Sequence, residues 1–255
     1  MKSILSQKLR NKFSKIFLLT LSSRPDRQSK SLKSLENIGL NINNGLTIQY
    51  ATPFPHNDII AAAFNQTGKG RFTKANEYDC SRNHYSIVRQ AYDDPTCKYV
   101  LVFEDDIQFL NKLDIISQFI DNIPEDFDVL QFGGFTADPK ITKYLKDIDN
   151  IDNSYWAKHP DVGIWNCSMY ALSRKGMKYY LDFMNTIFWV ADGPLYKAPL
   201  NHKIINSYIS TIPIVIQADK NIVSSDIRNS ENDNIDYANE NLYEKKVDKT
   251  QYFEY

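Results

Sequence analysis

Three consecutive acidic residues, Glu104, Asp105 and Asp106, directly follow a short apolar segment over residues 99–103. The segment is rich in β-branched and aromatic residues and too short for a helix, so it predicts a strand buried on both faces. The carboxyl ends of strands in open α/β sheets are where ligands bind, which places the triplet at a ligand-binding edge. Side chains alternate in extended backbone, so Glu104 and Asp106 are expected to face one side and Asp105 the other. Two such carboxylates suit Mg²⁺ or Mn²⁺ bridging a diphosphate, and a solvated turn is the alternative.

A second polar group, which includes Ser22, Arg24 and Arg27, follows the first expected strand, residues 16–21. Two arginines beside the start of a helix can hold a phosphate or a nucleotide. On these residues alone, an ordinary helix start with surface ion pairs is the favoured alternative.

Cys80 and His84 lie four residues apart in an expected helix over residues 76–92, so they share one helix face. They could bind zinc, but two ligands leave a zinc site incomplete. Packing of a small buried cysteine against a partly buried histidine is favoured, and His84 could instead order the acidic segment by hydrogen bonding. Cys80 is not expected to act as a nucleophile, because no base with an orienting partner is evident.

Two further aspartates stand at the starts of expected loops or helices. Asp192 precedes Gly193 and Pro194, where it would cap a helix or, opposite a metal site, serve as a general base. Asp226 follows the last expected strand, residues 212–217, and could meet phosphate or metal, or only form a turn.

The order of the expected elements predicts an α/β fold with a mixed, mainly parallel sheet flanked by helices on both faces. Strands alternate with helices along the chain, and Ser173 is expected to cap a helix that ends near residue 187. Strands are expected at residues 16–21, 46–50, 99–103, 127–132, 168–172 and 212–217.

Composition bounds the class of protein. The chain has 255 residues, 42% hydrophobic and 24% charged, which suits one large domain. A net charge of -1 gives no support to non-specific nucleic-acid binding. Three widely spaced cysteines form no disulfide framework, which favours a reducing compartment and a cytoplasmic protein. The apolar stretch at 16–21 is too short to span a bilayer or to form a signal peptide.

Three sections are expected along the chain. Residues 1–14 form a basic, solvated leader that makes at most peripheral contact with an anionic membrane. Residues 15–228 form the main α/β domain, and residues 229–255 form a polar tail that is weakly ordered unless its aromatic residues dock.

The ordered series of segments resembles glycosyltransferase family 25, the group of lipopolysaccharide and collagen glycosyltransferases. The resemblance covers roughly residues 15–228 and includes Asp192. Its remaining motifs are residues 16–27, 77–84, 99–106, 170–176 and 213–227.

The resemblance implies a GT-A (Rossmann-like) domain that moves a hexose from a nucleotide sugar, most often a UDP-hexose, to a glycan or glycolipid acceptor. Mn²⁺ (or Mg²⁺) would lie at the Asp-x-Asp-like motif, with Asp106 in direct contact and Glu104 in ribose or water-mediated contact. Asp192 would be the base of an inverting reaction. The resemblance further places on the donor side, or among the other site residues, Ser22, Arg24, Arg27, Ala51, Thr52, Asp105, Glu77, His84 and Asp226.

The chain departs from the family pattern at three places. Asp79 stands where a glycine is usual before the cysteine, and Asn83 where a serine is usual before the histidine. The loop at 52–55 lacks the usual Asp-Gly and carries two prolines. These departures bear on the donor base and the sugar.

Three aromatic residues in the polar excursion at 136–160, Tyr144, Tyr155 and Trp156, could form a wall for an acceptor sugar, or belong to a mobile surface loop. Two other functions are open. A sugar nucleotidyltransferase would use similar chemistry, but a glycine-rich phosphate loop is missing near the N-terminus. A catalytically silent glycan-binding module would bind sugar without metal or nucleotide.

Overall fold

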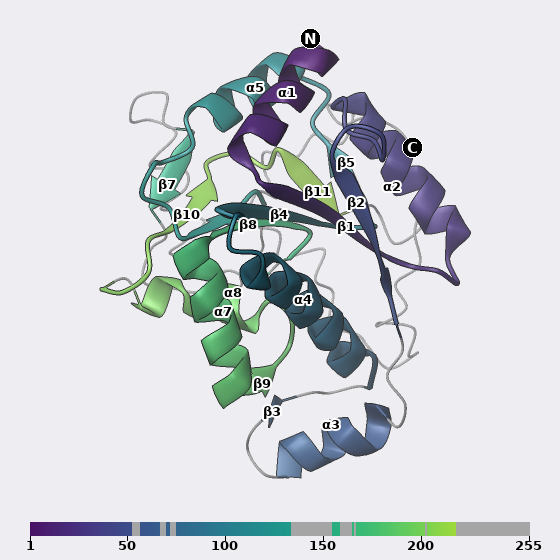
Figure 1. The fold of residues 1–255 in the computed structure, drawn as a ribbon, viewed down its shortest axis with the longest axis vertical. Coiled ribbons are helices and arrows are strands. Elements are labelled where there is room, and N and C mark those ends of the chain that lie inside the picture. The colour runs from purple at the N-terminus through teal and green to yellow at the C-terminus, as the bar shows by residue number, and fades with distance from the viewer. Residues whose placement is uncertain are drawn as a thin grey trace.

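The computed structural model describes residues 1–52, 57–66, 70–71, 75–133, 155–158, 165, 167–201 and 203–217. Within these residues the main sheet has seven strands in the order β2-β1-β4-β8-β6-β10-β7 (Figure 1). In chain order the strands of this sheet are β1 (Lys15–Leu21), β2 (Leu46–Ala51), β4 (Tyr99–Glu104), β6 (Val129–Gln131), β7 (Trp156–Lys158), β8 (Met169–Ser173) and β10 (Ser207–Ser210).

The predicted mixed, mainly parallel sheet is confirmed. Strand β1 pairs in parallel with β2 and β4, and β10 pairs in parallel with β6. Strand β8 runs antiparallel between β4 and β6, and β7 is an antiparallel edge strand. Because β8 is reversed, its first residue, Met169, pairs with Phe103 near the carboxyl end of β4.

Helices cover both faces of the sheet. Figure 1 shows α4 (Ala75–Asp93) beside α7 (Arg174–Thr186) on one face, with α1 (Lys2–Lys12), α5 (Leu113–Asp121) and α2 (Pro25–Asn37) on the other. Two apolar cores result, one on each face of β1: Leu18 belongs to the core with α1 and α5, and Phe17 to the core with α4 and α7. Because side chains alternate along a strand, β1 contributes apolar residues to the cores on both faces of the sheet.

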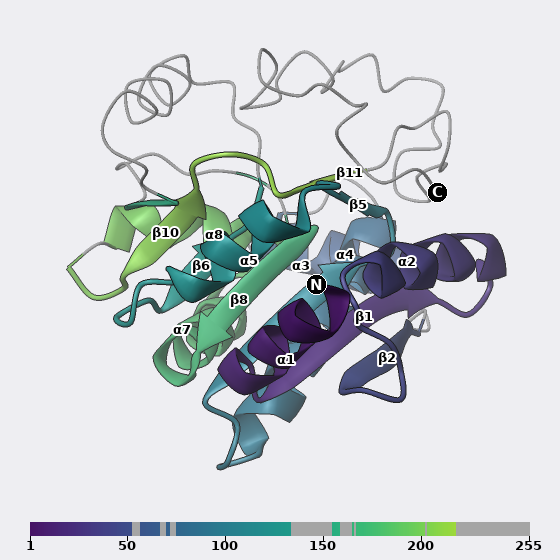
Figure 2. The same cartoon turned by 90° about the horizontal axis from the view of Figure 1, so that it is seen from above.

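Shorter elements complete the described structure. Helix α3 (Asn57–Gln66) precedes β3 (Gly70–Arg71), which pairs with β9 (Phe188–Trp189). Strand β5 (Ile107–Phe109) pairs with β11 (Val215–Gln217). Helix α8 (Gly193–Lys197) and a 3₁₀ turn at Pro199–Asn201 follow β9. Seen from above in Figure 2, α1 and α2 lie on the side of the sheet opposite α7.

The first residues differ from the solvated leader that the sequence led us to expect. Residues 2–12 form helix α1, in which Leu5 and Leu9 are fully buried, and Phe13 continues the same stripe. Lys8 extends from this helix to Ser117 and Asp121 of α5. Apolar residues four apart line one helix face, so this segment packs into the core despite its basic character.

Two of the three residues expected to form an acceptor wall have other roles. Trp156 is buried in the core and donates its indole N–H to the carbonyl of Phe119 over 2.9 Å. The Tyr155 hydroxyl donates to Gln118 Oε1 at 2.6 Å, and its ring packs against Phe119. Both therefore serve packing against α5, and Tyr144 lies outside the described residues.

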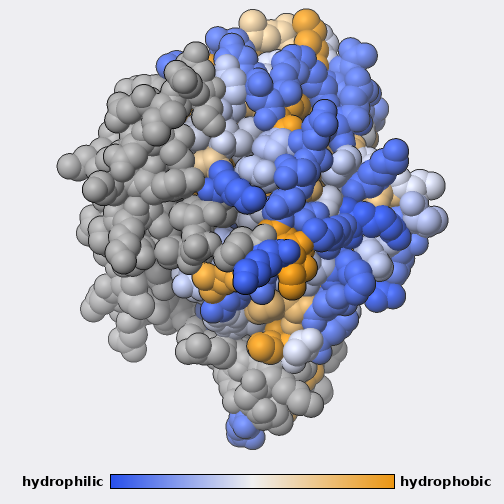
Figure 3. Space-filling view, turned by 90° about the vertical axis from the view of Figure 1, so that its left-hand side faces the viewer, coloured by the Kyte–Doolittle hydropathy of each residue, from blue (hydrophilic) through white to orange (hydrophobic). Residues whose placement is uncertain are grey.

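The surface of the described part is mainly polar. Figure 3 shows hydrophilic side chains over most of the described face, with a small apolar group near its centre. Among the described helices, none combines the length and the apolar composition that crossing a bilayer requires.

Helix α7 begins as expected at Ser173, whose hydroxyl accepts the Gly176 N–H at 3.1 Å and donates to Asp128 Oδ1 at 2.9 Å. A Cβ on Gly176 would stand 1.9 Å from the Asp128 carbonyl oxygen, a distance that requires the backbone to move. Only glycine therefore lets the start of α7 approach the residue before β6.

Gly176→Ala is expected to lower the free energy of unfolding by about 1–3 kcal/mol, because overpacking outweighs the higher helix propensity of alanine. Urea unfolding followed by circular dichroism measures it. Asp182→Ala, on the exposed face of the same helix, is the control and should change stability by less than about 0.5 kcal/mol. A Gly176→Ala protein as stable as the parent would contradict this packing.

Candidate active site

The carboxyl ends of three neighbouring parallel strands meet at one edge of the sheet. Strands β1, β2 and β4 end at Leu21, Ala51 and Glu104, and Leu19 is paired with Glu104. The acidic triplet forms the turn between β4 and β5 at this edge. The structure therefore brings the acidic triplet and the residues after β1 and β2 to one edge, where α/β folds bind ligands.

Asp105 faces β1 and is 5% exposed. Its Oδ2 accepts a hydrogen bond from the Thr20 hydroxyl at 2.7 Å and lies 3.4 Å from the Leu21 amide nitrogen. Its Oδ1 forms an ion pair with Arg27. Burial raises the pKa of Asp105 above its ordinary value, although Arg27 and Thr20 act in the opposite direction. This carboxylate therefore ties the acidic turn to β1 and presents little surface to a ligand.

The two predicted phosphate-binding arginines make ion pairs within the chain. Arg27 is 8% exposed and pairs with both Asp105 and Asp106, the latter at 3.4 Å. Arg24 holds Asp26 with two contacts of 2.9 and 3.0 Å, and this hydrogen bonding lowers the pKa of Asp26 to about 2. Arg27 is thus a counter-ion of the acidic turn, whereas Ser22 is exposed at the strand end.

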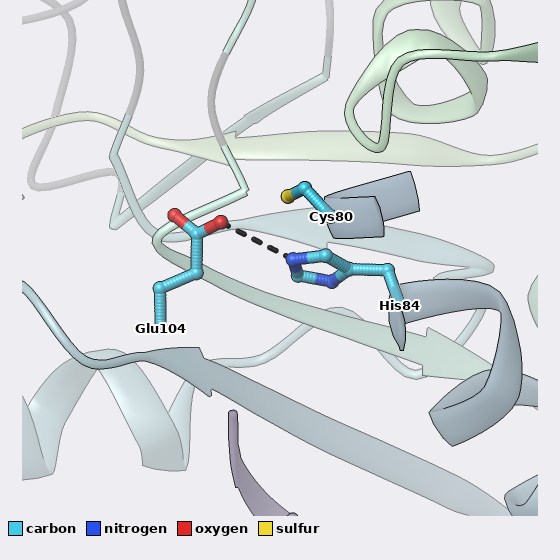
Figure 4. Close-up of side chains that lie close together, drawn as sticks. All are labelled: Cys80, His84 and Glu104. Carbon is cyan, nitrogen blue, oxygen red and sulfur yellow. Dashed lines mark hydrogen bonds and ion pairs between the residues drawn. The ribbon is translucent and has the colours of Figure 1, made fainter. Parts of the chain in front are cut away.

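Glu104 points away from Asp105, toward helix α4. Its Oε1 lies 3.2 Å from His84 Nε2 and accepts a hydrogen bond from the Cys167 thiol at 3.0 Å. Figure 4 shows the carboxylate facing the imidazole, with the Cys80 thiol beside them. Burial alone would raise the pKa of Glu104, but the hydrogen bond and electrostatic effect of His84 hold it below the ordinary value. Glu104 is therefore an ionised, partly exposed carboxylate in a fixed direction.

His84 is fully buried and is held from its other side by Tyr170, whose hydroxyl lies 3.0 Å from Nδ1. Burial raises the pKa of Tyr170 well above its ordinary value, so the hydroxyl keeps its proton and can donate to Nδ1. The ionised Glu104 can only accept, which assigns the ring proton to Nε2. The chain Tyr170–His84–Glu104 thus orders the acidic segment, one of the two roles considered for His84.

The Cys80 thiol is subject to the negative potential of four carboxylates. Burial raises the pKa of Cys80 well above its ordinary value, and further increases come, in order, from Glu104, Asp192, Asp106 and Glu77. The thiol is therefore protonated at neutral pH. Carboxylates from Glu77 to Asp192, up to 115 residues apart in the chain, thus contribute to one region of negative potential.

Asp192 occupies the N-cap position of α8, but its side chain makes no capping hydrogen bond. The segment around it is fixed by its neighbours: Tyr180 donates its hydroxyl to the Ala191 carbonyl at 2.8 Å, and a Cβ on Gly193 would approach the Trp189 ring to 2.9 Å. The ordinary capping role is therefore not what holds Asp192 here.

Three aromatic side chains, Trp165, Trp189 and Tyr196, form a group to which the residues on either side of Asp192 contribute. Trp165 stacks on Tyr196 with ring centroids 3.9 Å apart and an angle of 17° between the rings. Trp189 meets Trp165 edge to face at 5.7 Å. Trp189 and Tyr196 stand three residues before and four after Asp192, a spacing that could have pointed to this group in the sequence.

The end of β2 is held by α4. Asn83 Oδ1 accepts the Thr52 N–H at 3.0 Å, and its amide donates to the Thr52 carbonyl at 3.3 Å. Ala51 and Thr52 thus lie at the same edge as Glu104. Asn83 holds the end of β2 against α4 through its two hydrogen bonds to Thr52. Asp226 lies outside the described residues.

Two partners of Glu104, Cys167 and Tyr170, were not identified from the sequence. Tyr170 lies at the start of the reversed strand β8 and Cys167 two residues before the strand begins. The Glu104 amide donates to the Ser168 carbonyl at 2.9 Å. Without the knowledge that β8 runs antiparallel to β4, no local pattern associates these residues with the acidic triplet.

Comparison with known proteins assigns the class. A family model described as glycosyltransferase family 25 (LPS biosynthesis protein) matches residues 13–193. This protein is a glycosyltransferase, and the chain belongs to glycosyltransferase family 25.

Among solved structures, the chain is similar to a glycosyltransferase involved in the glycosylation of the major capsid of PBCV-1. The two share 13% identity, with 76% of this chain and 81% of that chain covered and a TM-score of 0.43. No curated protein matches the sequence.

His84→Ala is expected to lower kcat/KM for sugar transfer by about 10- to 100-fold, because positioning partners of site residues typically carry effects of this size. Loss of the hydrogen bond leaves burial to dominate, so the pKa of Glu104 should rise and the acid limb of the pH–rate profile should move to higher pH. A pH profile of both proteins measures this. An unmoved acid limb would show that His84 acts only in packing.

Proposed function

We propose that this glycosyltransferase moves a hexose from a nucleotide sugar, with a UDP-hexose as donor, to a glycan or glycolipid acceptor. The reaction inverts the anomeric centre and depends on Mn²⁺ or Mg²⁺. The observation that carries this proposal is the position of the acidic turn, with Glu104 and Asp106, at the carboxyl edge of β1, β2 and β4. Glu77 and Asp192 add to the negative potential beside it.

The donor atoms fit a hard divalent cation shared with phosphate. Mg²⁺ and Mn²⁺ commonly take one or two protein carboxylates and complete their coordination with phosphate oxygens and water. The side chains of Asp106 and Glu104 are each 18% exposed at the acidic turn. Asp106 would hold the cation directly and Glu104 through water or the ribose. When bound, such a cation stabilises the negative charge of the departing nucleotide.

Asp192 is the base of the proposed reaction. An inverting transfer is a single displacement, in which a carboxylate takes the proton of the acceptor hydroxyl as the oxygen attacks the anomeric carbon. Asp192 and Glu104 both raise the pKa of the Cys80 and Cys167 thiols electrostatically. This shared effect supports a position for Asp192 near the acidic turn.

The aromatic group of Trp165, Trp189 and Tyr196 is the proposed contact surface for the acceptor. Aromatic rings offer flat apolar faces with which sugar C–H groups pack well. Trp189 and Tyr196 flank Asp192 in the sequence, and Trp165 stacks on Tyr196. In the proposed reaction the acceptor hydroxyl lies at Asp192. The family description as an LPS biosynthesis protein supports a glycolipid among the possible acceptors.

Trp189→Ala is expected to raise the KM for the acceptor by about 3- to 10-fold, the equivalent of one aromatic contact of about 0.5–1.5 kcal/mol. The rate of donor hydrolysis to water should change little. Initial rates at varied acceptor concentration measure it. Tyr155→Ala serves as the control, and a larger acceptor effect there than at Trp189 would place the acceptor on the α5 side.

A panel of UDP- and GDP-sugars, each with Mn²⁺ and with a chelator, tests the proposal by thermal shift. Stabilisation by one donor in the presence of metal alone is the expected result. A sugar nucleotidyltransferase would instead release pyrophosphate from a nucleoside triphosphate and a sugar phosphate. Stabilisation by free glycans alone would indicate a binding module. A cytoplasmic location, with at most peripheral membrane contact, is part of the proposal and is supported by three free cysteines.

A further inference from the structure

The side chains of Cys80, His84 and Glu104 form a group of possible metal ligands among the described residues. The Cys80 sulfur, a ring nitrogen of His84 and a carboxylate oxygen of Glu104 all lie within 4.8 Å of one another. Cys80 and His84 come from successive turns of α4, and Glu104 from the end of β4 (Figure 4). This group is distinct in chemistry from the all-oxygen pair proposed for Mn²⁺.

We propose that Cys80, His84 and Glu104 bind a thiophilic divalent cation of the zinc class, and that its binding withdraws Glu104 from the nucleotide-sugar site. The first half depends only on the geometry of the three side chains. The second half, inhibition of transfer, rests on the proposed function.

The distances suit a four-coordinate cation. Bonds of about 2.0–2.3 Å in a tetrahedral zinc site hold the ligand atoms roughly 3.3–3.8 Å apart. His84 Nε2 and Glu104 Oε1 are 3.2 Å apart, so the cation needs only a small adjustment of this pair and of the Cys80 side chain. Cys167, whose thiol donates to Glu104 Oε1 at 3.0 Å, neighbours the carboxylate but lies outside this group of three ligand atoms.

The ligand set and its charge select a zinc-class cation. Thiolate and imidazole favour Zn²⁺ and related metals over Mn²⁺ or Mg²⁺. One thiolate and one carboxylate neutralise the dication, and Glu77, Asp106 and Asp192 add negative potential, as their effect on Cys80 shows. The cation therefore offsets the charge repulsion that the acidic residues otherwise impose on a thiolate.

The protons balance on binding. The Cys80 thiol releases one proton to solvent as the sulfur binds the cation. The proton that His84 Nε2 shares with Glu104 moves to Nδ1, where the Tyr170 hydroxyl at 3.0 Å can accept it. A hydrogen bond to the second ring nitrogen is the usual partner of a metal-bound histidine. Tyr170 is thus the orienting residue of the proposed site.

Cobalt absorption spectroscopy on the full chain tests the site. Metal-free protein titrated with Co²⁺ should show a thiolate-to-cobalt charge-transfer band and tetrahedral visible bands, and Zn²⁺ should abolish both. Cys80→Ser should remove the charge-transfer band, and Tyr170→Phe should weaken Zn²⁺ binding by about 10-fold or more. Cys97→Ser is the matched control, because that buried thiol lies elsewhere, near the Tyr99 carbonyl, and the band should persist.

Zinc-edge X-ray absorption of the unmodified protein supplies a test that needs no variant. A sulfur shell together with nitrogen or oxygen is the expected result. Coordination by oxygen and nitrogen alone, absence of the cobalt band, or a band that persists unchanged in folded Cys80→Ser would overturn the site.

Inhibition is tested separately by assaying transfer with Mn²⁺ at rising Zn²⁺ concentration. Each protein is compared with its own rate without Zn²⁺, and inhibition is expected for the parent and Cys97→Ser but not for Cys80→Ser. A cobalt-binding protein whose transfer is insensitive to Zn²⁺ would refute the withdrawal of Glu104. A cobalt-binding protein without any metal-dependent transfer would refute the proposed function and leave the zinc-class site standing.

Discussion

Asp106→Asn is expected to lower kcat/KM for transfer by about 10²- to 10³-fold, comparable to the loss of one transition-state charge contact in other enzymes. The variant should also lose most of the Mn²⁺-dependent binding of the donor, because a neutral amide is a poorer ligand for a hard cation. Asp106 is partly exposed at the acidic turn, whereas Asp105 beside it is buried against Thr20. Calorimetric titration with UDP and Mn²⁺, together with initial rates, measures both effects.

Asp105→Asn is the matched comparison within the same triplet. It weakens the buried ion pair with Arg27, so it should reduce stability by about 1–3 kcal/mol. Its donor binding, once folded, should still depend on Mn²⁺. If Asp105→Asn abolished metal dependence and Asp106→Asn did not, the assignment of the two faces of the triplet would be reversed.

Asp192→Asn is expected to reduce kcat by about 10²- to 10⁴-fold, the range over which a positioned general base contributes. Binding of the donor and Mn²⁺ should be unchanged, because the carboxylate acts on the acceptor. Experiment therefore distinguishes the two variants: Asp106→Asn should lose donor binding, and Asp192→Asn should lose the chemical step alone. Single-turnover kinetics with a labelled donor distinguish them.

Asp182→Asn provides the control for this substitution. Asp182 lies on the exposed face of α7 in an i,i+4 pair with Lys178. Its kcat should equal that of the parent. An Asp192→Asn enzyme with undiminished kcat would exclude Asp192 as the base and direct attention to Glu77, another carboxylate that acts on Cys80.

Much of the sheet could be predicted because its strands carry their own signals. The apolar segments that became β1 and β4 are buried, and the helix capped by Ser173 begins where expected. The reversal of β8 was not visible, since direction in a sheet depends on pairing with distant strands. The packing of α1 was not predicted, because its four basic residues indicated a solvated segment. The Leu5–Leu9–Phe13 stripe packs into the core all the same.

The candidate site could be predicted in part. Alternation in extended backbone placed Glu104 and Asp105 on opposite sides, as the structure shows through His84 and Thr20. The commitment of Arg27 to the acidic turn could not be inferred, because a helix-start arginine looks the same whether it faces phosphate or a buried carboxylate. The Cys167 and Tyr170 contacts depend on strand order, which local patterns do not contain.

The proposed function places the metal of a UDP-sugar complex at the acidic turn after β4. Manganese anomalous diffraction from crystals grown with UDP and Mn²⁺ tests it most directly. One anomalous peak is expected at the acidic turn, in coordinating contact with Asp106 and with the diphosphate. Bound UDP with no manganese peak there, or with the peak at carboxylates elsewhere, would contradict it.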